Sequence, residues 1–145
     1  MNNEFLNALV MYRNNAGLTQ EQASEKLCIS GRSLINYETG KTNVPDDIVN
    51  KMTKIYNAPV LGYYWLRNTQ TGKNILPALA KSSLAENGLS FLDGLNTANE
   101  YKTDVIKICL DNKIDASEQP KFKKIVEASK TLMKTLMNFT FSNPR

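Results

Sequence analysis

Residues 18–41 constrain the fold of this chain more than any other segment. Thr19 opens a Thr-x-x-Gln pattern, in which the side chains of Thr19 and Gln22 satisfy the free N–H groups of a helix start. Ser30 is a second residue of the N-cap type, and Gly40 favours a helix end. The segment therefore predicts two short helices joined by a tight turn, with a polar face on the second helix.

Helices are also predicted on both sides of this segment. The apolar spacing over residues 4–15 is helical, and Gly17 follows it. Pro45 begins a fourth helix, and residues 61–66 form a short fifth one after Pro59. Five helices in about 65 residues make a compact all-α unit. The positions expected to face its core are Leu6, Leu9, Val10, Ala23, Leu27, Leu34, Tyr37, Ile48, Met52 and Ile55.

The ordered set of these positions resembles the Xre/Cro family of phage-repressor-type DNA-binding domains over residues 4–67. The residues that carry the resemblance are Arg13, Gly17-Leu18-Thr19-Gln20, Ala23, Leu27, Ser30, Ser33-Leu34, Tyr37-Glu38 and Gly40-Lys41. The resemblance implies a five-helix, lambda-repressor-like domain. Its recognition helix, about residues 30–39, would enter the DNA major groove.

The resemblance implies that Arg32, Ser33 and Asn36 face the base edges. Arg and Asn suit this role, because each can make two hydrogen bonds to a purine, Arg to guanine and Asn to adenine. Gly31 leaves one reading position without a side chain. Cys28 stands where the turn commonly has Gly, so a left-handed conformation there costs about 1 kcal/mol. The alternative is that these polar residues are an ordinary solvated face.

Five further residues of the first half receive roles from the resemblance. Gln20, Lys41 and Asn43 are implied to contact DNA phosphates, with a solvated surface as the alternative for Lys41 and Asn43. Arg13 and Glu38 occupy a pair of positions that in the family often forms an internal ion pair. We therefore interpret these two charges as structural.

The second half is predicted to be helical and distinct from the first. We expect a DNA-binding domain over residues 1–68, a polar connection over 69–82 and a helical region over 83–145. The connection is expected to dock through Ile75, Leu76 and Leu79, and Gly88 and Gly94 are expected to weaken the helix that follows. Its apolar stripe comprises Leu89, Leu92, Leu95, Ala98, Tyr101, Val105, Ile106 and Cys109.

A turn at residues 111–115 and a cap at residues 115–118 predict a last helix. Its apolar positions, close to a heptad spacing, are Phe122, Ile125, Val126, Ser129, Leu132, Met133, Leu136 and Phe139. The aspartates of the turn do not make a calcium loop, because Ala116 and Phe122 stand where Gly and Glu are needed. We interpret Lys121, Lys123 and Lys124 as a solvated face. The second half is thus a helical hairpin that either dimerises or folds back on the first domain.

Composition excludes several functional classes. The chain has no histidine, which removes Ser-His-Asp and Cys-His catalysis, and it shows no phosphate-loop or dinucleotide-binding glycine pattern. Its two cysteines have no metal-type spacing. No signal peptide or transmembrane run is visible, so a cytoplasmic protein without cofactor, metal or enzymatic activity is expected.

The charge balance favours a dimer. The net charge is +4, but residues 1–68 hold seven basic against six acidic residues, or only +1. We therefore expect a dimeric regulator of transcription, a repressor of the prophage type, reading a palindromic operator on double-stranded DNA. The alternative is an antitoxin or adaptor whose C-terminal hairpin binds a partner protein.

Overall fold

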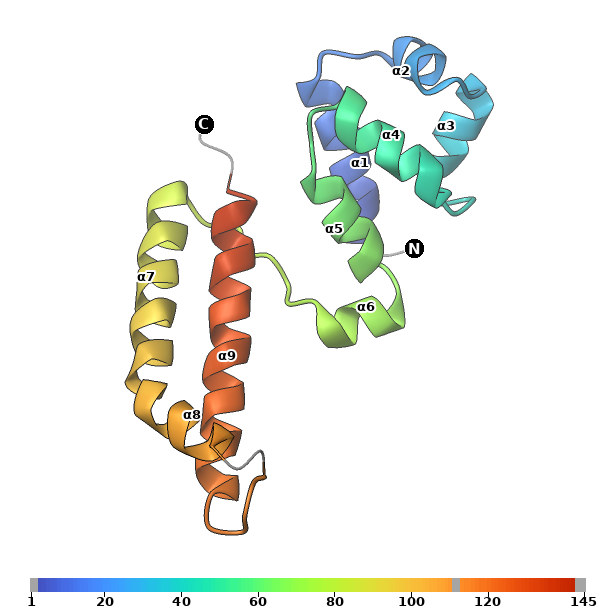
Figure 1. Cartoon of the computed structure of the whole chain (residues 1–145). Helices are drawn as coiled ribbons and strands as arrows, with labels where there is room; N and C mark the ends of the chain where they lie inside the picture. Colours follow the sequence, from blue (N-terminus) through green and yellow to red (C-terminus); the bar gives the residue numbers. More distant parts are fainter. Residues whose placement is uncertain (1–2, 111–112, 143–145) are drawn as a thin grey trace. The chain divides into compact units, whose positions relative to one another are not determined.

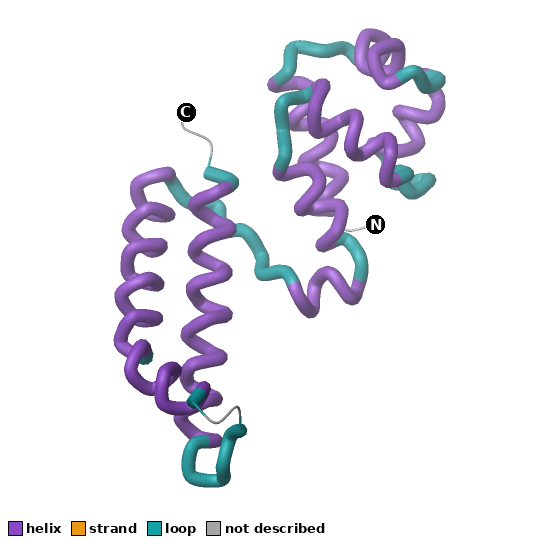
Figure 2. Tube along the Cα trace, viewed as in Figure 1, coloured by secondary structure: helices purple, strands orange, loops and turns teal. Residues whose placement is uncertain are grey.

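The protein is described here by a computed structural model of residues 3–110 and 113–142. Over these residues it contains helices and no strand, as Figure 2 shows. The chain divides into two compact units, an N-terminal unit Met1–Leu76 and a C-terminal unit Pro77–Arg145. No helix among the described residues is long and apolar enough to cross a membrane. The expected all-α fold is confirmed.

The N-terminal unit contains one helix more than the sequence predicted (Figure 1). Its helices are α1 (Asn3–Asn15), α2 (Gln20–Leu27), α3 (Gly31–Glu38), α4 (Asp46–Ile55), α5 (Val60–Arg67) and α6 (Gln70–Ile75). Helix α6 lies inside the segment expected to be a polar connection. Its Gly72 is so close to α5 that an added Cβ would overlap the carbonyl oxygen of Leu66. The expected docking through Ile75 is wrong, because that side chain is 63% exposed.

The core of the N-terminal unit draws on each of its first five helices. The largest fully buried side chains are Phe5, Leu9, Leu27, Leu34, Met52 and Leu61. Phe5 and Ala8 bury the face of α1, whereas the expected core residues Leu6 and Val10 are half-buried. The buried face of α1 is thus rotated slightly from the one that we predicted.

The C-terminal unit is a hairpin of two long helices, with a short helix at its closed end (Figure 1). Its helices are α7 (Leu84–Glu100), α8 (Lys102–Cys109) and α9 (Gln119–Thr140). Helices α7 and α9 run antiparallel, side by side. Two residues of the expected turn, Asp111 and Asn112, lie outside the described residues. Asp115 and Glu118 exchange hydrogen bonds as expected, but α9 begins just after them.

The hairpin closes on a different face from the predicted stripe. Leu89, Leu92 and Leu95 are 69%, 56% and 41% exposed, so they do not form its inner surface. Instead α7 and α9 meet at Gly94, where an added Cβ would lie 2.7 Å from the hydroxyl of Thr135. The glycine that we expected to weaken α7 therefore lies where α7 and α9 pack closely against each other.

Two buried asparagines hold the open end of the hairpin. Asn138 accepts a hydrogen bond from the backbone N–H of Ala80 at 2.8 Å. The amide of Asn87 donates to the hydroxyl of Ser142 at 2.7 Å, and its carbonyl oxygen accepts from Ser82 at 2.6 Å. These bonds join the start of α7 to the end of α9, so they fix the register of the two helices.

Candidate nucleic-acid interface

The turn between α2 and α3 is set by local hydrogen bonds. Thr19 Oγ1 accepts from the backbone of Gln22 at 3.2 Å, and Gln22 Oε1 accepts from the backbone of Thr19 at 3.0 Å. Ser30 Oγ accepts from the backbone of Ser33 at 3.0 Å. Between the helices Cys28 is left-handed, with φ 56° and ψ 47°. The predicted capping box, N-cap and strained turn residue are all confirmed.

The outer face of α3 carries polar side chains that are accessible to a ligand. Arg32 is exposed and Asn36 is half-buried, four residues further along the same face. Ser33 is half-buried, and its hydroxyl lies 2.8 Å from that of Ser30. The structure thus leaves Arg32 and Asn36 available to a DNA base, whereas the hydroxyl of Ser33 already takes part in the cap.

One exposed residue of α3 was missed by the sequence reasoning. Ile35 is 42% exposed and lies three residues after Arg32, beside Asn36. An exposed isoleucine between polar neighbours suits contact with a thymine methyl group. The signal was present in the sequence, because inward positions at Leu34 and Tyr37 place Ile35 nearer the outer face.

Arg13 and Glu38 form a buried ion pair between α1 and α3. Arg13 Nε lies 2.6 Å from Glu38 Oε1, and Arg13 Nη2 lies 3.2 Å from Oε2. A further guanidinium nitrogen donates to the carbonyl oxygen of Leu18 at 2.9 Å. The hydrogen bond with Glu38 raises the pKa of Arg13 above its ordinary value. The pair therefore joins the first and third helices to the chain segment that leads into the second.

The same carboxylate also holds Gln20 at the start of α2. Gln20 Nε2 donates to Glu38 Oε2 at 2.8 Å. An amide nitrogen has two N–H groups, so the second remains for a phosphate oxygen. Gln20, the residue expected to contact a phosphate, is thus hydrogen-bonded to the buried ion pair. Glu38 orients the side-chain amide of Gln20.

The loop after α3 presents Lys41 and Asn43, both exposed. It is held to α5 by Trp65, whose Nε1 donates to the carbonyl oxygen of Val44 at 3.0 Å. Asn43, Val44 and Trp65 line a hollow of about 340 Å³ together with the segment that follows α5. The polar side chains of the loop are therefore presented from a backbone that the core holds in place.

Tyr56, a buried tyrosine near the Arg13–Glu38 ion pair, adds no charge to this surface. Burial raises the pKa of Tyr56 to about 12, with a smaller contribution in the same direction from Glu38. Its hydroxyl is buried without a hydrogen-bond partner among the described residues.

No group of three His, Cys, Asp or Glu side chains within residues 3–110 and 113–142 is placed to hold a metal ion.

Comparison with protein families gives one match. Residues 9–61 match the family described as helix-turn-helix, a span that includes α2, α3 and the turn between them. Comparisons with curated proteins and with solved structures gave no significant match. Residues 9–61 therefore form a helix-turn-helix domain, and this match supports the expected Xre/Cro type and a DNA-binding regulator of transcription.

Proposed function

We propose that the protein is a dimeric repressor that reads a palindromic operator through the major groove. The observation that carries this proposal is the outer face of α3, where Arg32 and Asn36 are accessible on a helix fixed at both ends. The Ser30 cap holds its start and the Arg13–Glu38 pair holds its last turn. Side chains on such a rigid element can discriminate bases, because the geometry of their hydrogen bonds is set before DNA binds.

Arg32, Ile35 and Asn36 have complementary chemistry for reading bases. Arg32 suits the O6 and N7 acceptors of guanine, and Asn36 suits the N6 donor and N7 acceptor of adenine. Ile35 adds an apolar contact for a thymine methyl group. Ser33 lies at the edge of this face and keeps acceptor capacity beside its bond to Ser30.

The phosphate contacts are supplied from both ends of the motif. Gln20 at the start of α2 and Lys41 and Asn43 after α3 would bind the sugar-phosphate backbone on either side of the recognition helix. These are few contacts, and the charge of residues 1–68 is only +1. Two copies, with recognition helices about 34 Å apart, would double the phosphate contacts and read both halves of a palindrome.

Selection of bound sequences from a random DNA pool tests the proposal. The wild-type chain is expected to select an inverted repeat. Arg32→Ala is expected to weaken specific binding by about 1–3 kcal/mol and to relax one base position in each half-site. Lys41→Ala is the matched control: it removes one cation without a base contact, so it weakens all sequences equally and lowers the salt dependence.

Two results would contradict this assignment. A consensus without two-fold symmetry would argue against the dimer. An Arg32→Ala chain with the wild-type consensus and affinity would show that α3 does not read bases through that side chain.

A further inference from the structure

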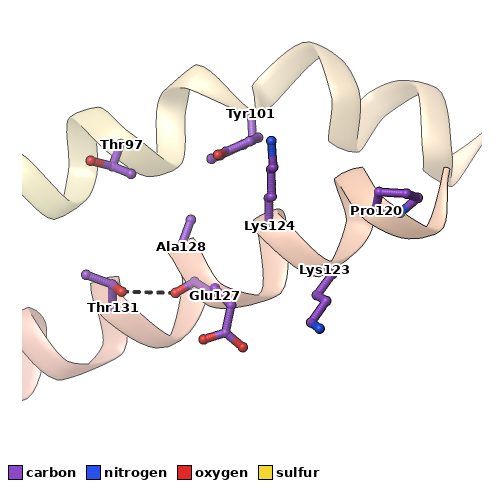
Figure 3. A pocket seen from close by; sticks show the side chains of 8 residues that line it. All are labelled: Thr97, Tyr101, Pro120, Lys123, Lys124, Glu127, Ala128 and Thr131. Carbon is purple, nitrogen blue, oxygen red and sulfur yellow. Dashed lines mark hydrogen bonds between the residues drawn. The ribbon is translucent and has the colours of Figure 1, made fainter.

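The hairpin contains a hollow of about 540 Å³ between its two long helices, towards the closed end (Figure 3). Thr97 and Tyr101 line it from the last turn of α7 and the residue after it. Lys124, Ala128 and Thr131 line it from α9. Sites for small molecules in proteins have volumes of about 300–1,000 Å³. The hollow is therefore large enough to hold a small molecule.

Most of the surface that lines this hollow is apolar. Ala128 is buried in its floor, and the rings of Tyr101 and Pro120 and the methyl groups of Thr97 and Thr131 surround it. Transfer of a hydrocarbon group from water onto such a surface is favourable, because apolar area is removed from water on both sides. The lining therefore favours a ligand with an apolar body.

Two hydrogen-bond donors reach the hollow from opposite helices. Lys124 extends from α9 towards α7, and the hydroxyl of Tyr101 belongs to the facing wall (Figure 3). Among the described residues, neither the ammonium of Lys124 nor the hydroxyl of Tyr101 has a hydrogen bond or an ion pair. An ammonium can only donate, and a phenol donates well to an anion. The pair therefore favours an acceptor that carries negative charge.

The acidic side chains of α8 and α9 do not supply this acceptor. Asp104 of α8 accepts from Lys121 at 2.9 Å, and Glu127 of α9 accepts from Lys130 at 2.8 Å. The carboxylate of Glu127 is directed away from α7, although the residue lines the hollow (Figure 3). Both carboxylates are thus engaged by other lysines, and Lys124 is left for a ligand.

The start of α9 adds positive potential at the same end of the hollow. Helices usually carry acidic residues in the first turn, because the unpaired backbone N–H groups give this end a partial positive charge. Helix α9 has no acidic residue in its first turn, and Lys121, Lys123 and Lys124 follow Pro120 there. Pro120 and Lys123 also line the hollow. An anionic group at this end would be stabilised by the helix start and the lysines together.

We propose that the hollow binds a small amphipathic carboxylate, with its carboxylate between Lys124 and Tyr101 and its apolar body along Ala128 and Thr131. A carboxylate has two acceptor oxygens, so it can bind an ammonium and a hydroxyl at the same time. One pair of donors matches one anionic group, whereas a nucleic acid or an acidic helix presents several. A DNA phosphate would also leave the apolar lining in contact with water. The proposal adds a ligand site to the regulator and does not depend on how α3 reads bases.

Isothermal titration calorimetry of the full chain with decanoate tests the proposal, and NMR chemical shifts locate the bound probe. Decanoate joins one carboxylate to a straight apolar chain, and it is used below its micelle concentration. It is expected to bind and to shift the amide signals of Thr97, Ala128 and Thr131. Acetate lacks the apolar chain, and decyltrimethylammonium replaces the carboxylate by a cation. Both are expected to bind at least about tenfold more weakly than decanoate.

Three conservative variants separate the donors from net charge. Lys124→Met keeps an apolar stem but removes the ammonium, and it is expected to weaken decanoate binding about three- to fivefold. Tyr101→Phe removes only the hydroxyl and is expected to weaken binding about three- to tenfold. Lys134→Met is the matched control, because it removes the same charge from α9 at a residue that does not line the hollow. It is expected to change binding less than about twofold.

Four results would overturn the proposal. Decanoate that does not bind, or that shifts only exposed leucines such as Leu89 and Leu92, would show that the hollow is not its site. Equal weakening by Lys124→Met and Lys134→Met would mean that only net charge matters. Equal binding of decyltrimethylammonium would mean that the apolar chain alone is recognised. An acidic amphipathic peptide that binds in the hollow where decanoate does not would assign it to a partner protein. No arm of the test uses DNA, so its failure is separate from a failure of base reading by α3.

Discussion

The two units bury their apolar residues in opposite ways. The N-terminal unit encloses side chains such as Leu27, Leu34 and Met52 completely, whereas the hairpin leaves Leu92 and Leu95 in contact with solvent. The difference lies in the number of helices that can surround a side chain. Several helices packed at different angles enclose a core, but two parallel cylinders meet along a single line. The N-terminal unit therefore encloses its own core, while the hairpin leaves much of its apolar surface exposed.

The polar interior of the two units differs as well. The N-terminal unit buries a charged pair, Arg13 and Glu38, and the hairpin buries two neutral amides, Asn87 and Asn138. A charged pair enclosed in a core becomes costly when one member is removed. Losing a partner of a buried neutral amide costs less free energy than losing a partner of a buried charge. Asn87 and Asn138 instead set the register of α7 against α9. Substitutions in each unit test this difference between the N-terminal unit and the hairpin.

Removing Glu38 is expected to have the largest effect. Glu38→Ala leaves the buried guanidinium of Arg13 without its carboxylate and should cost the N-terminal unit about 3–5 kcal/mol of unfolding free energy. Trp65 is the one tryptophan of the chain and belongs to this unit. Urea unfolding followed by its fluorescence therefore reports the loss.

A double variant controls for the cause of that loss. Arg13→Met combined with Glu38→Leu removes both charges and should recover much of the stability. It should not restore DNA affinity, since Gln20 would still lack the carboxylate that orients its amide. A loss below about 1 kcal/mol in Glu38→Ala would mean that the pair contributes no more than a surface ion pair.

Two glycines of α7 separate close packing from helix propensity in the hairpin. Gly94→Ala is expected to cost about 1–2 kcal/mol, because its Cβ would overlap Thr135. Gly88→Ala is the control, with a Cβ 3.5 Å from the ring of Phe139, and should gain about 0.5–1 kcal/mol from helix propensity. Thermal melts of both variants at one chain concentration give the comparison. Equal stabilisation by both would contradict the tight contact at Gly94.

Cys28 gives a smaller effect of the opposite sign in the N-terminal unit. Glycine has no steric penalty at φ 56°, so Cys28→Gly should stabilise this unit by about 0.5–1 kcal/mol. Asn57 has a similar φ of 51° after α4, and asparagine tolerates this region better. Asn57→Gly should therefore gain less in the same Trp65 fluorescence assay. A larger gain at Asn57 would show that the strain is not at the turn between α2 and α3.

The smallest expected effect is a difference between two capping boxes in their response to acid. Hydrogen bonds from the backbone and hydroxyl of Ser83 lower the pKa of Glu86 below its ordinary value of 4.5. A lowered folded-state pKa contributes stability above the ordinary value, and this is lost as the pH falls through the folded-state pKa. The box of α2 uses Gln22, which does not titrate.

Hydrogen exchange at the starts of α7 and α2 measures this difference. Acidification below pH 4.5 should increase exchange at the start of α7 more than at the start of α2, relative to the intrinsic rates. Glu86→Gln should remove the excess. The same excess in the Gln variant would place its origin in another carboxylate.

Sequence alone was sufficient where structure is set by near neighbours. The caps at Thr19 and Ser30 and the left-handed Cys28 depend on a few adjacent residues, so their pattern could be interpreted directly. The buried face of α7 could not, because its leucines occupy more than one side of the helix. Contacts at Gly94 and the bonds of Asn87 selected the side that meets α9, and neither residue is apolar.

The candidate site divides in the same way. Arg32 and Asn36 could be placed from the spacing of Leu34 and Tyr37 on one helix. The bond between Gln20 and Glu38 joins residues that are 18 positions apart, and no local pattern indicates it. The resemblance implied an ion pair between Arg13 and Glu38, but not the hydrogen bond by which Gln20 joins that pair.

Gly31 gives the recognition helix room for a change of target. An added Cβ there would meet nothing closer than the hydroxyl of Ser24 at 3.9 Å, so the fold itself does not require glycine. Under the proposed function, a single substitution at this position would add a side chain that faces DNA without disturbing the helices around it. One amino-acid substitution would therefore be enough to direct the same scaffold to a different operator.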